Sequence, residues 1–340
     1  MPVTIRDIAK NLGLSIAAVS RALNGYPDIS EETRQRVVQA AKDMGYVPNR
    51  AARQLRRRKA DAIGYVLPSH IPRFADPFFT EFVAGLGDET ARHPFDLTIS
   101  IAPPGEEAEK RLYQNWVQGH KVDGFILTHL RLKDWRVDYL TKQSLPFSAL
   151  ESVQDIRKFP RVDVDRLGGT LSLVAYLTQR GFRRIAFIGG PSELQIQASQ
   201  FNGYRQGLEN AGIPFDPGLV TTSDLTSTGG LQATKRLLSL LDPPDAIMCI
   251  NDETAIGALH SLRELGVSIG TDVAVTGFDG VAMSAHSDPP LTTLYIPVYE
   301  IARKLVELLA GELKHQSSFE RRIVITPRLL KRASTGDSLS

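Results

Sequence analysis

Four apolar segments of the sequence end in side chains that could bind a small polar molecule. His129, Glu151, Asn251 and Asp279 each follow a hydrophobic run. Imidazole, carboxylate and amide groups exchange hydrogen bonds with hydroxyl groups. If the runs are parallel strands, their carboxyl ends lie along one edge of a sheet, where open α/β folds bind ligands. The pattern predicts a small-molecule cleft.

The sequence contains none of the motifs we tested for catalysis. GxxxxGKS/T, GxSxG and HExxH are all missing, so an enzyme is the least favoured interpretation and we expect no cofactor. No metal-ligand spacing links the histidines, which we expect to be solvated or hydrogen-bonded: His70, His93, His120, His129, His260, His286 and His315. Cys249 lies in an apolar run and is expected to be a buried hydrophobe rather than a reactive thiol.

An alternating pattern of strands and helices must position the candidate cleft. Amphipathic segments separate the apolar runs, which indicates doubly wound parallel sheets. The chain of 340 residues is long enough for two or three domains. The expected strands are residues 62–68, 96–102, 123–129, 146–150, 184–190, 245–251 and 272–279.

The first 45 residues show a different, helical periodicity. Apolar residues recur at helical spacing over residues 4–24, with Thr4 and Ser15 as N-caps and Gly13 between two short helices. A third helix is expected between Ser30 and Gly45. This predicts a helix-turn-helix, whose second helix suits the DNA major groove. A three-helix bundle of another kind would show the same periodicity.

The charge is unevenly distributed along the chain. Residues 1–59 contain twelve Lys or Arg and five Asp or Glu, a net charge of +7, whereas the remaining 281 residues have a net charge of −5. A basic head suggests a polyanionic partner. A solvated charge run is the alternative, although residues 50–59 hold six cations and no acid.

The head resembles a known family through TIRDIAKNLGLSIAAVSRALNG and ISEETRQRVVQAAKDMGYVPNRAARQL. These segments resemble the lactose/galactose repressor (LacI/GalR) family of bacterial transcriptional regulators. The resemblance implies a homodimer that binds near-palindromic operator DNA, as a repressor or an activator. It implies base contacts in the major groove by Ser15, Ile16, Ala17, Ser20 and Arg21, and phosphate contacts by Thr4, Asn24, Ser30, Thr33 and Tyr46.

The same resemblance implies a hinge helix over Asn49–Arg56. Leu55 would be wedged into the minor groove at the centre of the operator, beside Ala52. An apolar side chain among cations suits a wedge that unstacks a base step, although Leu55 could also pack on its own helix or on the body. The chemistry of the head agrees, because Arg21 can donate two bonds to guanine, whereas Ile16 and Ala17 offer only apolar contacts.

The rest of the chain, residues 61–330, resembles the effector domain of this family. The segments that carry the resemblance are DPFF (76–79), NDETAIGAL (251–259), GFD (277–279) and PPLTTL (289–294). They imply a two-lobed, periplasmic-binding-protein-like (type I) fold with parallel sheets and strand exchange near residues 162 and 292. Ligand-facing positions would be Asp76, Phe78, Phe79, Thr128, Glu151, Gln200, Leu225, Asn251, Glu253 and Asp279.

Several of these positions have a second interpretation. Asn251 and Asp252 precede a helix, so one of them could be only an N-cap. At least one of Phe78 and Phe79 is expected in the core, and Asp279 could be a turn residue. Two departures from the family pattern are Gln200, where an arginine is usual, and Phe182, where Gly181 is usually followed by histidine.

The expected organisation is a helix-turn-helix domain (1–47), a hinge (48–60), an effector and dimerisation domain (61–330) and a tail (331–340). Within the effector domain, lobe 1 would comprise residues 61–161 and 292–330, and lobe 2 residues 162–291. The tail has no heptad pattern, so nothing in it suggests a tetramerising coil.

These observations predict a transcriptional regulator whose operator affinity is controlled by a small ligand. Glu151, Glu253 and Asp279 would repel an anion, and no cation is identified near them, so we expect a neutral sugar or glycoside. An extracytoplasmic sugar receptor is the alternative, but neither a signal peptide nor an apolar run of 18 residues is found. We expect a cytoplasmic protein.

Overall fold

The computed structural model describes residues 3–46, 59–67, 77–151, 159–314 and 321–337. The chain divides into two compact units, Met1–Ala60 and Asp61–Ser340. We call them the head and the body, and each is described by itself.

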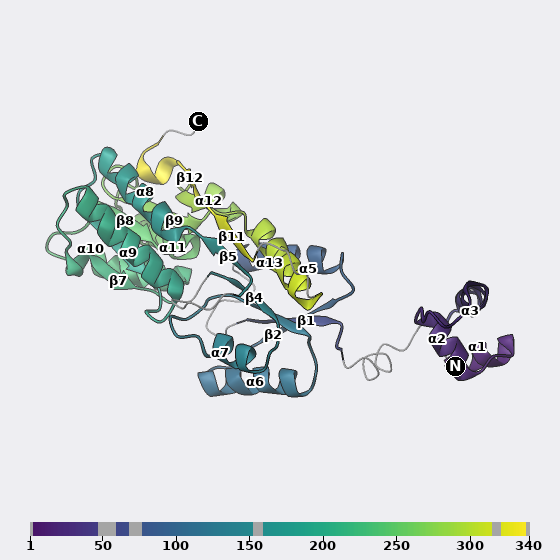
Figure 1. The fold of residues 1–340 in the computed structure, drawn as a ribbon. Helices are drawn as coiled ribbons and strands as arrows, with labels where there is room; N and C mark the ends of the chain where they lie inside the picture. Colours follow the sequence, from purple (N-terminus) through teal and green to yellow (C-terminus); the bar gives the residue numbers. More distant parts are fainter. Residues whose placement is uncertain (1–2, 47–58, 68–76, 152–158, 315–320, 338–340) are drawn as a thin grey trace. The chain divides into compact units, whose positions relative to one another are not determined.

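The described part of the head contains α1 (Ile5–Leu12), α2 (Ile16–Leu23) and α3 (Glu31–Asp43) (Figure 1). Ile8, Val19 and Val37, one from each helix, are fully buried against one another at the centre of a small core. The helical periodicity in the sequence is therefore confirmed as the inner face of a three-helix unit.

The ends of the head helices follow the capping chemistry that the sequence suggests. The Asp7 carboxylate accepts hydrogen bonds from the backbone N–H of Thr4 at 2.8 Å and from its hydroxyl at 2.7 Å. Ser15 and Ser30 accept backbone N–H groups at the starts of α2 and α3. Gly13 has a φ of +67°, which a residue with a side chain rarely adopts, and this left-handed residue ends α1.

The described body contains two six-stranded sheets. The first sheet has the order β11-β5-β4-β3-β1-β2, and the second has the order β12-β10-β9-β8-β6-β7. All neighbouring pairs are parallel except β10 and β12. The bounds are β1 (Ala62–Leu67), β2 (Asp96–Ile101), β3 (Gly124–Leu127), β4 (Phe147–Leu150), β5 (Arg161–Val164), β6 (Ile185–Gly189), β7 (Val220–Thr222), β8 (Ala246–Cys249), β9 (Ala274–Asp279), β10 (Thr292–Tyr295), β11 (Arg322–Ile325) and β12 (Arg328–Leu330).

Helices cover these sheets and complete an α/β architecture (Figure 1). In the first lobe, α5 and α13 pack side by side, and in the second, α8 packs against α9 and α10 against α11. The helices are α5 (Pro77–Thr90), α6 (Glu106–Gln118), α7 (Trp135–Lys142), α8 (Arg166–Gln179), α9 (Gln195–Asn210), α10 (Ser227–Leu238), α11 (Asp252–Glu264), α12 (Ala282–His286) and α13 (Val298–Leu313).

The chain passes between the sheets three times, at places that differ from the expected lobe boundaries. β5 belongs to the first sheet, so the first crossing follows Val164. β10 pairs with β9 in the second sheet, so the return comes after Tyr295. β11 lies in the first sheet and β12 in the second, which adds a third crossing. Among the described residues, lobe 1 therefore comprises 61–67, 77–151, 159–164, 297–314 and 321–325, and lobe 2 comprises 165–296 and 326–337.

The described part of the expected tail is integrated into lobe 2. Ser334 and Thr335 are fully buried. Ser334 Oγ accepts the backbone N–H of Thr292 at 2.8 Å and donates to the carbonyl oxygen of Val275 at 2.6 Å. Paired in this way, the segment holds β9 and β10 together, because Ser334 bonds one residue of each strand.

In the described part of the chain, no helix combines the length and apolar character that crossing a membrane requires.

Two glycines of α5 offer a matched test of the α5–α13 packing. A Cβ on Gly85 would lie 2.4 Å from the carbonyl oxygen of Tyr299, whereas a Cβ on Gly87 would meet nothing within 4 Å. We expect Gly85→Ala to lower the free energy of unfolding by about 1–3 kcal/mol or more, and Gly87→Ala to leave it unchanged or raise it by up to about 1 kcal/mol. Urea unfolding of both variants measures this. Equal effects would contradict the close approach of the two helices.

Candidate ligand pocket and DNA-contacting surface

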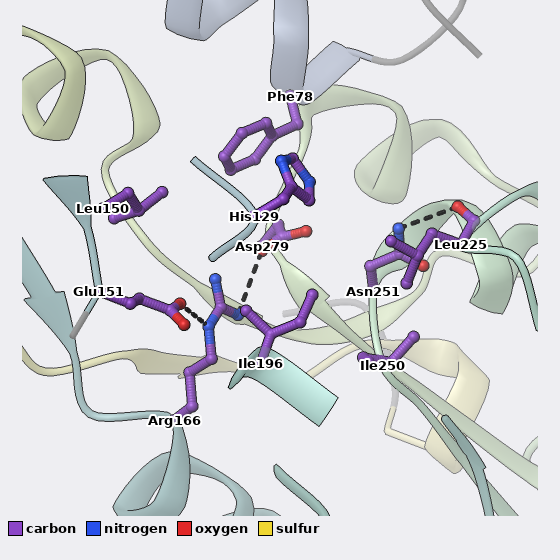
Figure 2. Close-up of a pocket in the computed structure, with 10 residues that line it drawn as sticks. All are labelled: Phe78, His129, Leu150, Glu151, Arg166, Ile196, Leu225, Ile250, Asn251 and Asp279. Carbon is purple, nitrogen blue, oxygen red and sulfur yellow. Dashed lines mark hydrogen bonds and ion pairs between the residues drawn. The ribbon is translucent and has the colours of Figure 1, made fainter. Parts of the chain in front are cut away.

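A pocket lies at the carboxyl ends of strands from both lobes. The space between its walls, including the open mouth, is about 510 Å³. Figure 2 shows how the lining side chains converge on it. They are Phe78, His129, Leu150, Glu151, Arg166, Ile196, Leu225, Ile250, Asn251 and Asp279.

A buried ionic triad forms one wall of this pocket. Arg166 Nε donates to Glu151 Oε1, and Arg166 Nη1 lies 3.7 Å from Asp279 Oδ1 (Figure 2). Glu151 follows β4 in lobe 1, whereas Asp279 ends β9 in lobe 2. Arg166 is the first residue of α8, directly after the first crossing, and its guanidinium also lies over the ring of Phe278, 4.7 Å from the centroid. The triad thus joins the two lobes.

The environment of the triad determines its charge. Glu151 and Arg166 are 6% and 5% exposed. Burial raises the pKa of Glu151, although the adjacent Arg166 acts in the opposite direction. Burial disfavours the charged form of Arg166, but the two carboxylates outweigh it and raise the pKa of Arg166. One cation therefore faces two carboxyl groups, so the triad has no free positive charge to offer a ligand.

Four lining residues have backbone conformations that side chains rarely adopt. The φ angles are +50° at His129, +76° at Glu151, +68° at Leu225 and +104° at Asp279. Each such residue costs about 1–3 kcal/mol unless its surroundings hold it in place. Three of them, His129, Glu151 and Asp279, follow or end a central strand, and their side chains line the pocket at the carboxyl ends of these strands.

The remaining walls combine apolar surface with a single amide. Phe78, Leu150, Ile196 and Ile250 provide apolar contacts. Asn251 is both an N-cap and a lining residue, because its side chain accepts the N–H of Thr254 at 3.0 Å and donates to the carbonyl of Leu225 at 3.1 Å. The N-cap is therefore confirmed for Asn251, and its contact with a ligand stays a prediction.

The structure brings about half of the expected ligand-facing residues to the pocket. Phe78, Glu151, Leu225, Asn251 and Asp279 line it. Phe79 packs against the core, the hydroxyl groups of Thr128 and Tyr65 lie 3.1 Å apart, and Glu253 is not among the lining residues. Asp76 lies outside the described residues.

Gln200 differs most from its expected role. It is 2% exposed and does not line the pocket, because its amide donates to the carbonyl oxygen of Ile250 at 3.0 Å. Ile196, one turn earlier on α9, faces the pocket instead.

The expectation that no cation lies near the carboxylates is wrong, because Arg166 lies between two of them. Arg166 was missed because it follows the RVDV segment, which forms β5 but contains charged residues that interrupt the apolar run. Leu150, Ile196 and Ile250 were also not predicted to face the ligand.

The expected base-contacting residues of α2 are largely exposed in the head. Ser15, Ile16, Ala17 and Arg21 are exposed, with Ile16 at 47%, and Ser20 is half-buried. Arg21 Nη2 forms an ion pair with Asp28 Oδ2 at 2.6 Å.

The expected phosphate-contacting residues lie at helix ends or near them. Thr4 and Ser30 are exposed N-caps, whereas Asn24, Thr33 and Tyr46 are half-buried. Asn49, Ala52 and Leu55 lie outside the described residues, so the hinge stays a prediction.

Removing the central cation should destabilise the body. Arg166→Met preserves much of the side-chain volume but leaves Glu151 and Asp279 buried without their partner, which we expect to cost about 3–5 kcal/mol. Without Arg166 the pKa of Glu151 rises further, so protonation relieves the penalty at low pH, and the loss should be larger at pH 8 than at pH 5. Denaturant unfolding at both pH values measures it.

Arg184→Met is the matched control, because Arg184 also pairs with two carboxylates, Asp216 and Asp242, but at the surface. We expect it to cost at most about 1 kcal/mol at either pH. Equal losses in the two variants would show that the buried triad has no special importance.

Two family models match the chain. Residues 4–49 match the model described as "Bacterial regulatory proteins, lacI family". Residues 174–335 match the model described as "Periplasmic binding protein-like domain".

Relatives match nearly the whole length of the chain. The HTH-type transcriptional regulator AglR of Rhizobium meliloti is 34% identical over 340 residues, which cover 99% of this chain and 95% of AglR. The HTH-type transcriptional repressor CytR of Escherichia coli K12 is 31% identical and covers 98% of this chain and 96% of its own.

Two solved structures of transcriptional regulators are similar to nearly the whole length of this chain. A complex of the transcriptional regulator CelR with cellobiose has a TM-score of 0.75 at 29% identity, covering 98% of this chain and 99% of CelR. The lac repressor dimer bound to operator and the anti-inducer ONPF has a TM-score of 0.84 at 26% identity, with the same coverage.

These relatives are named as transcriptional regulators and not as enzymes. The predictions of a helix-turn-helix head, a periplasmic-binding-protein-like body and a DNA-binding regulatory function are therefore confirmed. With a whole-length relative at 34% identity, the chain belongs to the lacI family of bacterial regulatory proteins.

Proposed function

We propose that this regulator binds near-palindromic operator DNA as a homodimer and that a neutral sugar or glycoside in the interlobe pocket controls its operator affinity. The observation that carries the proposal is the triad of Glu151, Arg166 and Asp279, which joins residues of both lobes at the wall of the pocket. A ligand bound there contacts both lobes, so its affinity depends on their relative positions. The CelR–cellobiose complex, a relative with the same fold, supports a sugar as the ligand class.

The charge of the pocket favours a neutral ligand. Arg166 is shared by two carboxyl groups, which leaves the triad with a formal charge of −1. A phosphate or acid would bring like charge into a buried site, at a cost of several kcal/mol. Hydroxyl groups can donate to the carboxylates, and Phe78 with the aliphatic side chains offers a surface for the apolar face of a sugar ring.

The head supplies the DNA-binding function. Its net charge supports salt-dependent attraction to DNA, and the exposed residues at the start of α2 are suited to the major groove. We place the protein in the cytoplasm, because its partner is DNA and its single cysteine, Cys249, is free and buried. Whether the sugar releases or tightens DNA binding depends on which lobe arrangement the operator-bound dimer prefers.

Arg21→Ala should relax sequence preference at one base pair in each half-site. A bidentate contact with guanine is worth about 1–3 kcal/mol of discrimination, so selection on random duplexes should return a degenerate base at that position. Arg36→Ala, which removes an exposed arginine of α3, is the control and should leave the selected sequence unchanged. A uniform loss of affinity for all sequences in Arg21→Ala would show that Arg21 contacts phosphate only.

Asp279→Asn should weaken sugar binding by about tenfold or more, because a charged acceptor in the buried pocket is lost. It should not change operator affinity in the absence of sugar. Calorimetry with neutral mono- and disaccharides and with their 6-phosphates, together with operator titrations, measures both. Asp242→Asn, at an exposed surface ion pair, should change neither. Tight binding of phosphosugars with inert neutral sugars would contradict the charge argument.

A further inference from the structure

A second cavity lies beside the pocket along the same edge of the first sheet. It encloses about 580 Å³ including its mouth. Lobe 1 contributes the segment after β2 with the start of α6, together with residues that follow β3, and lobe 2 contributes Glu193 and Leu194. His129 lines both this cavity and the first pocket, so the two spaces are neighbours across one side chain.

A lobe-to-lobe contact borders the second cavity. The backbone N–H of Leu132 donates to the carbonyl of Glu193 at 2.8 Å, and that of Gln195 donates to the carbonyl of Leu130 at 2.9 Å. Together these two hydrogen bonds make an isolated antiparallel β-bridge between Arg131 and Leu194. Both of these residues line the cavity. Any occupant of the cavity therefore touches both lobes where they meet.

Glu109 and Arg131, which line the cavity, each have one buried polar atom that forms no hydrogen bond with the described residues. Glu109 is only 4% exposed, and its Oε2 accepts Arg131 Nη2 at 2.8 Å. Its Oε1 is buried and has no hydrogen bond from any residue that the structure describes, since Arg136 Nη1 lies 3.9 Å away. Among the same residues, the buried Arg131 Nη1 also has no acceptor. An unsatisfied buried polar atom costs about 1–3 kcal/mol, so the pair indicates a site that is completed by another molecule.

The second cation that lines the cavity, Arg136, already donates hydrogen bonds to other groups of the protein. Arg136 is 1% exposed and donates to both oxygens of Asp134, at 2.9 and 2.6 Å, and to the carbonyls of Thr128 and His129. It holds the loop after β3 in place and is not available to neutralise an anion.

The chemistry of the cavity fits neutral hydroxyl groups. Three carboxylates, Glu106, Glu109 and Glu193, line the cavity with two arginines, Arg131 and Arg136, and Glu106 also pairs with Lys110. The arginines have carboxylate partners of their own, which disfavours phosphate or carboxylate ligands. No group of three metal-ligating side chains occurs among the described residues. Glu109 and Arg131 both line the cavity. A carboxylate can accept from a sugar hydroxyl and a guanidinium can donate to one, because each hydroxyl can both donate and accept.

We propose that the effector is a disaccharide or longer glycoside whose two sugar units occupy the two cavities. One ring binds in the pocket at the Glu151–Arg166–Asp279 triad, and the next unit binds Glu109 Oε1 and Arg131 Nη1 beyond His129. This inference rests on the proposed sugar-controlled function and adds the size class of the sugar and the residues that select it.

Calorimetry on the full-length protein tests the second cavity with matched sugar pairs. The pairs are methyl α-D-glucoside with maltose, methyl β-D-glucoside with cellobiose, methyl α-D-galactoside with melibiose, and methyl β-D-galactoside with lactose. In at least one pair we expect the disaccharide to bind about tenfold or more tightly than the methyl glycoside. Glu109→Gln and Arg131→Gln should each remove most of this advantage and leave methyl glycoside binding unchanged.

Glu107→Gln is the control, because Glu107 is an exposed residue of α6 whose carboxylate pairs with Lys110 and does not line the cavity. It should change neither affinity. Equal affinities within every pair that binds would overturn the inference and leave the sugar-controlled function intact. Equal weakening of both pair members by Glu109→Gln and Arg131→Gln would also overturn it, because that result indicates a structural role. If no sugar binds or alters operator affinity, the proposed function itself fails.

Discussion

The contact between Arg166 and the two carboxylates Glu151 and Asp279 is the constraint on which the body depends. A buried carboxylate requires a cation, so the loss of Arg166 would leave both Glu151 and Asp279 buried without their partner. The partners come from different sheets, one at the end of β4 and one at the end of β9. The triad therefore fixes the relative position of the strand ends that form the pocket.

This arrangement links ligand chemistry to lobe movement. The pocket residues have strained backbones at the ends of strands, and their side chains contact both lobes, so a ligand that binds them favours one lobe arrangement over another. The contact between residues 130–132 and 193–195 lies on the same edge and would be broken if the lobes opened there. A ligand that fills the neighbouring cavity would stabilise that contact as well.

Much of this architecture can be predicted from the sequence, because central strands that are buried on both faces appear as continuous apolar runs. All seven expected runs form strands, namely β1, β2, β3, β4, β6, β8 and β9. The five missed strands lack this signal. β11 and β12 contain arginines and are partly exposed, and β7 has three residues. Charged residues interrupt β5, and two threonines begin the four-residue β10. Glu151 and Asp279 could be placed because they follow apolar runs. Arg166 could not, because charged residues interrupt β5, and Gln200 could not, because the face that α9 presents depends on its packing.

The central claim is that sugar and operator binding are coupled through the lobes, and the coupling must be reciprocal. The most direct measurement is a closed thermodynamic cycle on the full-length dimer. Operator affinity is measured with and without saturating sugar, and sugar affinity with and without saturating operator, at one salt concentration. We expect the ratio of operator affinities with and without sugar to differ from one and to equal the ratio of sugar affinities with and without operator. Operator affinity that is the same with and without bound sugar, for a sugar that binds at the triad, would contradict it.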